Sequence, residues 1–294
     1  MARFQSWKTA ARPHTLPAAV VPVLVGGGLA YGDEAFRWDA LVWALIGALS
    51  IQIGANFAND ASDAHRGADT AERLGPPRMV ALGVIQPSRM WAATWAAIAI
   101  AAAAGVALTS IAGPWVLVIG AASVLAMLGY VGGPIPYGYR GLGEVFVFVF
   151  FGLVATVGSR FVHDGNTPRS AWLLAVPVGL LVTAILVVNN LRDIGSDEAA
   201  GKRTLAVVMG AAPTRRLFTI LVYGAYLVIA VLAIAALTPR ATALAVLVAP
   251  MAAAPVRMVN SGAEGADLIG ALTLTARAHL WTGVMLTIGA VVTL

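Results

Sequence analysis

Nine apolar stretches, each about as long as a bilayer is thick, limit what this sequence can fold into. A transmembrane helix needs about 20 mostly apolar residues, whereas only 11% of the 294 residues are charged, against about 25% in soluble domains. The sequence therefore predicts an all-α integral membrane protein with about nine transmembrane helices, a single domain over residues 1–294. The expected spans are 15–31, 40–56, 90–109, 114–130, 144–162, 171–188, 217–237, 241–256 and 278–294.

Basic residues are unevenly distributed between the two sides of this expected bundle. With these spans, fifteen of the nineteen lysines and arginines lie on one side. The exceptions are Arg37, Arg160, Arg169 and Arg240. Because positively charged loops are retained in the cytoplasm, we expect this side and the N-terminus to be cytoplasmic, with the protein in the cell (plasma or inner) membrane. The same rule explains the net charge of +5, so no nucleic-acid partner is expected.

A first carboxylate-rich motif, NFANDASDAHRGAD at 56–69, follows the second expected span. On a helix, Asn56, Asp60 and Asp63 occupy positions i, i+4 and i+7, which share one face. Carboxylates at this spacing repel each other, and ionisable groups at membrane depth are costly enough to indicate function. The motif lies on the expected cytoplasmic side.

A second motif, NNLRDIGSDEAAGKRTL at 189–205, repeats the pattern on the same side. Here Asn189, Asp193 and Asp197 occupy positions i, i+4 and i+8. Solvation of a loop explains single acidic residues. It does not explain why an asparagine and two aspartates recur at helical spacing in two separate segments. Mg²⁺ takes carboxylate oxygens together with substrate phosphates, so two facing motifs predict a site for two Mg²⁺ ions and a diphosphate. The expected metal ligands are Asp60, Asp63, Asp193 and Asp197, with Asn56 and Asn189 assisting catalysis.

Basic and aromatic residues close to these motifs are candidates for binding the remaining phosphate oxygens. They are Arg66, Arg192, Lys202, Tyr137, Tyr139 and Arg140. Four further residues are second-rank candidates, because a loop position or a helix-start carboxylate stabilised by the helix dipole explains an acidic residue equally well. They are Asn59, Asp69, Glu144 and Glu198.

With these motifs, the chain resembles the UbiA superfamily of intramembrane prenyltransferases. Further marks are ARPHTLPA at 11–18, GPPRMV at 75–80 and PYGYRGLGE at 136–144. The last of these and NNLRD at 189–193 are similar to the branch, especially its actinobacterial members, that prenylates 1,4-dihydroxy-2-naphthoate in menaquinone synthesis. The resemblance covers nearly the whole chain.

The resemblance implies nine helices around a central cavity, with a cytoplasmic cap over the aspartates. It also implies Mg²⁺-dependent transfer of a polyprenyl group from polyprenyl diphosphate to dihydroxynaphthoate, with release of diphosphate and CO₂, giving demethylmenaquinone. The partners would be these two substrates and the lipid bilayer.

Three alternatives remain open from the sequence. One is a related prenyltransferase with another aromatic acceptor, such as 4-hydroxybenzoate, haem or homogentisate. A CDP-alcohol phosphotransferase would carry its aspartates in one contiguous motif rather than in two distant ones. An ion-coupled transporter would hold its charged residues near the bilayer midplane, whereas these motifs lie at one face.

Overall fold

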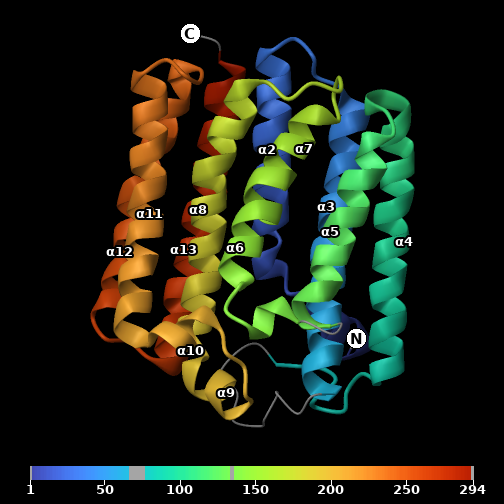
Figure 1. The fold of residues 1–294 in the computed structure, drawn as a ribbon, viewed down its shortest axis with the longest axis vertical. Coiled ribbons are helices and arrows are strands. Elements are labelled where there is room, and N and C mark those ends of the chain that lie inside the picture. Colours follow the sequence, from blue (N-terminus) through green and yellow to red (C-terminus); the bar gives the residue numbers. More distant parts are fainter. Residues whose placement is uncertain (1, 66–76, 133–135, 293–294) are drawn as a thin grey trace.

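The computed structural model describes residues 2–65, 77–132 and 136–292, and it is an elongated bundle of helices (Figure 1). The described residues are mostly helical and contain no strand, which confirms the all-α prediction. The main helices are α1 (Ala2–Ala11), α2 (Pro17–Gly32), α3 (Trp38–His65), α4 (Pro87–Ala112), α5 (Trp115–Val131), α6 (Gly143–Val147), α7 (Ala155–Phe161), α8 (Arg169–Arg192), α9 (Ile194–Ala199), α10 (Leu205–Met209), α11 (Ala211–Ile234), α12 (Ala249–Asn260) and α13 (Leu268–Val291). Tighter or wider turns form η1 (Pro13–Thr15), η2 (Tyr137–Tyr139), η3 (Phe148–Val154), η4 (Arg240–Val248) and η5 (Gly265–Asp267).

The predicted count of nine spans is not confirmed. Among the described residues, six helical segments are long and apolar enough to cross a membrane. A seventh is obtained if the segments that contain α1 and α2, which meet at a bend of 52°, count as one span. Each predicted span overlaps a helix, but α5 is apolar over only Trp115–Tyr130 and is shorter than a full crossing.

Two helix ends differ from the predicted ones in a way that matters for the site. The second span was predicted to end at residue 56, but α3 continues to His65 and carries the whole Asn56–Asp60–Asp63 series on one helix. The last span was predicted to start at residue 278, but α13 starts at Leu268. Hydropathy marks where apolar residues stop, and a helix continues past that point when its polar side chains find partners.

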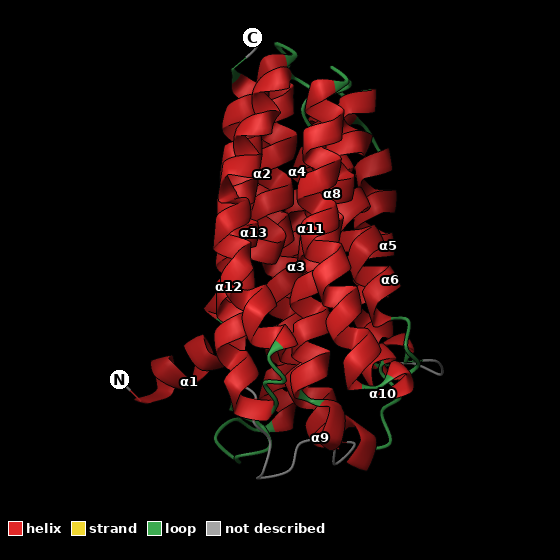
Figure 2. Cartoon of the chain, turned by 90° about the vertical axis from the view of Figure 1, so that its left-hand side faces the viewer, coloured by secondary structure: helices red, strands yellow, loops and turns green. Residues whose placement is uncertain are grey.

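The bundle has two ends that differ in what they hold. Helices α1, α9 and α10 lie at the end that also holds the N-terminus, here called the site end (Figures 1 and 2). The C-terminus lies at the opposite end, here called the far end. The largest hydrophobic core joins α2, α8, α11, α12 and α13 along one side of the bundle.

Glycines allow the central helices to pack closely. Segment η3 is a π-helix, a wider turn that often marks a functional site. Its Gly152 faces Gly179 of α8, and a Cβ added to Gly152 would lie 2.4 Å from the Cα of Gly179. Only glycine fits there, so η3 and α8 approach each other backbone to backbone.

The far end is closed by polar and apolar contacts. The Arg160 guanidinium is 3% exposed and pairs with Asp33 at 2.9 Å and Asp164 at 2.7 Å. The backbone N–H of Arg37 donates to Nδ1 of His163 at 3.0 Å. Burial, and then the nearby Arg160 charge, lower the pKa of His163 to about 4. Beneath these residues lies a hydrophobic layer, which consists of Ala40, Leu108, Val116 and Val162.

Candidate functional site

A cavity of about 390 Å³ extends through the bundle from the site end toward the far end. Its wall comes from α2, α3, α4, α5, α8 and the segment α6–η3–α7. Most of the wall is apolar, with Met127, Phe146 and Phe150 among its side chains. Its charged residues gather at the site end, so the cavity offers a polar mouth and an apolar interior.

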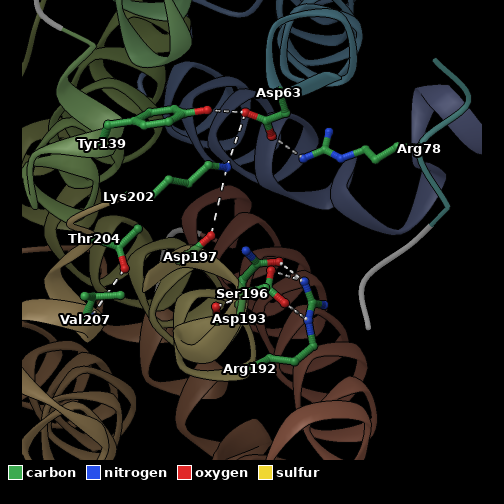
Figure 3. Close-up of polar contacts among 11 residues, drawn as sticks. Asp63, Arg78, Tyr139, Arg192, Asp193, Ser196, Asp197, Lys202, Thr204 and Val207 are labelled. Atoms are coloured by element: carbon green, nitrogen blue, oxygen red, sulfur yellow. Dashed lines mark hydrogen bonds and ion pairs between the residues drawn. The ribbon is translucent and has the colours of Figure 1, made fainter. Parts of the chain in front are cut away.

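Asp63 contacts three polar side chains at this mouth (Figure 3). Its Oδ2 accepts from Nη2 of Arg78 at 2.7 Å, and its Oδ1 accepts from the Tyr139 hydroxyl at 2.7 Å. Lys202 Nζ lies 3.3 Å from the same Oδ1. Asp63 is 3% exposed but lines the cavity. Its carboxylate is therefore shielded from bulk water, yet a molecule in the cavity can reach it.

Lys202 joins the two carboxylate motifs. Its Nζ lies 3.9 Å from Oδ1 of Asp197 and 4.8 Å from the centre of the Tyr139 ring. The backbone holds it there, because the N–H of Lys202 donates to the carbonyl of Asp197 and that of Arg203 donates to the carbonyl of Tyr139. Residues far apart in the sequence therefore meet at one point, as the prediction of two facing motifs required.

Asp193 lies at the break between α8 and α9 and forms a two-pronged pair with its neighbour. Arg192 donates from Nε and from Nη2 to the two carboxylate oxygens, each at 2.7 Å. Nη2 also donates to Oδ1 of Asn189 at 3.0 Å. Asn189, Arg192, Asp193 and Asp197 all line the cavity. The turn at Asp193 preserves the predicted spacing, since the N–H of Asp193 donates to Asn189 and that of Asp197 donates to Asp193.

Asp60 occupies a different environment from the other three aspartates. Its two oxygens accept the backbone N–H groups of Met79 and Val80, at 3.0 and 3.1 Å. Asp60 is 1% exposed and is absent from the cavity wall. Met79 and Val80 pack with Phe57 in a small hydrophobic core. Asp60 therefore anchors this segment, whose Arg78 reaches Asp63.

The remaining predicted residues divide into three groups. Asn56 and Asn59 line the cavity, and Asn56 donates to the Ala11 carbonyl and to Thr15 Oγ1 at 2.9 and 3.0 Å. Arg140 and Glu198 are exposed and lie outside the cavity wall. Arg66 and Asp69 lie outside the described residues.

Tyr137 and Tyr139 were predicted together but have separate surroundings. The Tyr137 ring lines the cavity, and its hydroxyl donates to the backbone carbonyl of Ala126. Burial raises the pKa of Tyr137 above its usual range. Tyr139 instead donates to Asp63. Only Tyr139 therefore contacts the charged mouth.

The polar wall residues that sequence reasoning missed include Arg12, Arg78 and Asn190. Arg12 has a left-handed backbone with φ of 52°, which is uncommon outside glycine and is frequent at functional sites. Arg12 and Arg78 lie within two of the segments that carry the family resemblance, which was the available signal. Asn190 lies within NNLRD at 189–193, another of these segments.

The donor set at the mouth fits Mg²⁺ in the presence of a diphosphate. Within the described ranges no three carboxylate or imidazole groups converge into a site that holds a metal alone. Mg²⁺ needs no such cage, because it binds one or two carboxylates and takes its other ligands from phosphates and water. Asp63 on one motif and Asp193 and Asp197 on the other offer oxygens from opposite walls.

Comparisons with known proteins agree with this geometry. Residues 19–267 match the model of the UbiA prenyltransferase family. The chain is 40% identical over 279 residues to the 1,4-dihydroxy-2-naphthoate octaprenyltransferase of Mycobacterium leprae, covering 95% of this chain and 93% of that protein. It is 34% identical over 295 residues to the Escherichia coli protein of the same name, covering 98% and 96%.

Solved structures show the same fold. A UbiA homologue from Archaeoglobus fulgidus, bound to GPP and Mg²⁺, superposes with a TM-score of 0.69 at 14% identity, covering 96% of this chain and 99% of that one. The homologue from Aeropyrum pernix gives the same score at 15% identity, covering 95% and 97%. With its fold, its two facing aspartate motifs and relatives of matching length, this chain belongs to the UbiA prenyltransferase family and is a prenyltransferase.

Proposed function

We propose that this protein transfers a polyprenyl group from polyprenyl diphosphate to 1,4-dihydroxy-2-naphthoate in an Mg²⁺-dependent reaction that releases diphosphate and CO₂ and gives demethylmenaquinone in its reduced, hydroquinone form. One observation carries the proposal. Lys202 spans Asp63 and Asp197, from two distant motifs, at the mouth of a cavity whose interior is apolar. A substrate with a charged diphosphate head and a long apolar chain matches this division.

The relatives support the choice of acceptor. Proteins named 1,4-dihydroxy-2-naphthoate octaprenyltransferase from two mycobacteria are each 40% identical over 95% of this chain. The acceptor in the names of these relatives is therefore the one that we propose for this chain.

At the mouth, the chain's own residues bind and orient the diphosphate. Asp63, Asp193 and Asp197 are the proposed metal ligands, with Asn59 and Asn189 beside them. Mg²⁺, when bound there, neutralises the charge that builds on the departing diphosphate. Lys202 and Arg192 are placed to contact phosphate oxygens directly.

The cavity interior serves the rest of the reaction. The bond between the allylic carbon and the diphosphate oxygen breaks, and the electron pair leaves with the diphosphate. The apolar wall, with Met127, Phe146 and Phe150, keeps water from the allylic cation. The electron-rich ring of the acceptor then forms the new carbon–carbon bond, and its carboxylate departs as CO₂.

Apolar helices and family membership indicate a multi-pass membrane protein. We further propose that it lies in the cell membrane with the N-terminus and the site end in the cytoplasm, where α9 and α10 form part of a cap. The excess of basic residues on that side supports this orientation, and water-soluble dihydroxynaphthoate would enter from there.

The test is a transfer assay with the purified protein in detergent or in vesicles. Labelled polyprenyl diphosphate and dihydroxynaphthoate are supplied with Mg²⁺, and the lipid-soluble product and released CO₂ are both measured. We expect turnover that stops on chelation and returns when Mg²⁺ is added back. Transfer to 4-hydroxybenzoate but not to dihydroxynaphthoate, or turnover that survives chelation, would refute the proposal.

A further inference from the structure

A buried carboxylate on α6 contacts the cavity wall through one asparagine. Glu144 is 6% exposed, and its Oε1 accepts from Nδ2 of Asn190 at 2.9 Å. Its Oε2 is buried and has no hydrogen-bond partner among the described residues. Asn190 is 5% exposed and lines the cavity. The Glu144–Asn190 hydrogen bond therefore connects a buried carboxyl group to the cavity wall.

This contact fixes the polarity of the Asn190 amide. Oε1 of Glu144 accepts from the NH₂ group of Asn190 and so holds that group toward Glu144. The carbonyl oxygen Oδ1 then points away from Glu144, and no donor to it is found in the described part of the chain. Asn190 thus presents a hydrogen-bond acceptor in the cavity wall.

The surroundings of this acceptor suit a flat aromatic molecule. The rings of Tyr137 and Phe146 stack at 3.7 Å between centroids, and Phe150 continues the stack at 6.0 Å from Phe146. Tyr130 meets Tyr137 edge to face at 5.5 Å. All four line the same cavity as Asn190. Aromatic groups favour stacked and edge-to-face neighbours of their own kind, so this part of the cavity matches the acceptor better than a flexible prenyl chain.

The position along α8 brings such an acceptor to the reacting end. Asn190 follows Asn189, which accepts from Arg192, and Arg192 pairs with Asp193. A ring held at Asn190 therefore lies within about one helical turn of the proposed diphosphate site. We propose, on the basis of the proposed function, that Asn190, oriented by Glu144, binds a phenolic hydroxyl of the aromatic acceptor and so helps to select hydroxylated acceptors.

The first test inverts the polarity of the amide. In E144Q, an NH₂ group in the position of the partnerless Oε2 would leave two buried donors unbonded. The glutamine therefore turns its NH₂ toward Asn190 and donates to Oδ1, which turns the Asn190 NH₂ toward the cavity and removes the acceptor. We expect the KM for dihydroxynaphthoate to rise about tenfold, the effect of one hydrogen bond, while the KM for polyprenyl diphosphate stays within about twofold. The matched control is E264Q, because Glu264 is exposed and remote from the cavity wall.

The second test restores the polarity by exchanging the two side chains. In E144Q/N190D, the glutamine donates to the new carboxylate, whose other oxygen again faces the cavity as an acceptor. We expect the double variant to recover at least half of the lost acceptor affinity, whereas N190D alone, which opposes two carboxylates, does not. The N190A variant removes the acceptor outright and gives the same measurement if E144Q fails to fold.

A third test identifies the hydroxyl itself. The monohydroxy analogues 1-hydroxy-2-naphthoate and 4-hydroxy-2-naphthoate are used as competitive inhibitors of the wild-type enzyme and of E144Q. The analogue that lacks the bound hydroxyl should have the same inhibition constant for both enzymes, while the other should bind E144Q about tenfold less tightly. A general loss of packing would weaken both analogues alike.

The outcomes separate this inference from the proposed function. Transfer by the wild-type enzyme to dihydroxynaphthoate tests the function, and the KM ratios are measured with whichever hydroxylated aromatic the enzyme accepts. An unchanged acceptor KM in E144Q and N190A, or an equal rise in both KM values, overturns the role of Asn190. So does a folded double variant, with wild-type thermal stability, that recovers no acceptor affinity.

Discussion

The environments of Asp60 and Asp63 predict opposite results for the same chemical change at two positions three residues apart. Asp63 lines the cavity and contacts Lys202, whereas both oxygens of Asp60 accept backbone N–H groups outside the cavity wall. We expect D63N to impair catalysis and D60N to impair folding stability. The pair is well matched, because both residues lie on α3 and both are at least 97% buried.

The size of each effect follows from the contacts. Removing one charged group that stabilises a developing anion costs roughly 3–4 kcal/mol, on the order of 10²- to 10³-fold in kcat/KM. In D60N, the amide oxygen still accepts one N–H group, so the loss is one bond to a charged acceptor, about 1.5–3 kcal/mol. That loss should lower the melting temperature by about 5 °C or more, with kcat/KM changed less than about fivefold.

The assay combines an Mg²⁺ titration of prenyl transfer with thermal unfolding of the purified variants. D63N should raise the Mg²⁺ concentration that gives half-maximal activity, and D60N should leave it unchanged. Loss of more than about 100-fold in D60N, at unchanged thermal stability and with a shifted Mg²⁺ requirement, would show that Asp60 is a metal ligand. Retention of more than about a tenth of wild-type activity by D63N would equally refute the reasoning.

Three further predictions follow from other contacts. K202M removes the cation between Asp63 and Asp197 and should raise the KM for polyprenyl diphosphate about tenfold, measured by initial rates, without changing the acceptor KM. The folded state favours neutral His163, whose pKa is about 4 there against an ordinary value of 6.5. The contribution of His163 to folding stability is therefore complete above pH 6.5 and is lost as the pH falls toward 4. Between pH 7.5 and 5, the melting temperature of H163N should fall less than that of the wild type. G152V should unfold several degrees earlier than the wild type because its side chain meets the Gly179 backbone, whereas the control G224A, whose added Cβ meets nothing within 4 Å, should not.

The sequence was sufficient to predict the fold class, the two motifs and their meeting at one end of the bundle. Charge asymmetry placed both motifs on one side, and the Lys202 contacts confirm that they face each other. Helical register was also predicted well for Asn56, Asp60 and Asp63, which share the continuous helix α3. These features depend on the local pattern of apolar residues and on the distribution of charge across the membrane, both of which can be read from the sequence.

Helical register alone did not reveal which aspartate lines the cavity and which one binds backbone N–H groups. Asp60 and Asp63 have the same residue type on the same helix, yet Asp60 binds the amides of Met79 and Val80 about twenty residues downstream. Asn190 was missed for the same reason, since its partner Glu144 comes from a different helix. Such long-range pairings are set by packing, and a single sequence gives no signal for them.

The hydrophobic layer at the far end has a consequence for the membrane as a whole. A cavity that starts at a charged mouth and continues through much of a helical bundle could let ions leak across the membrane if it opened at both ends. Ala40, Leu108, Val116 and Val162 pack together at its far end, and their side chains offer an ion no replacement for its hydration shell. The enzyme can thus hold a large lipid substrate without letting ions leak through the membrane and dissipate its electrochemical gradient.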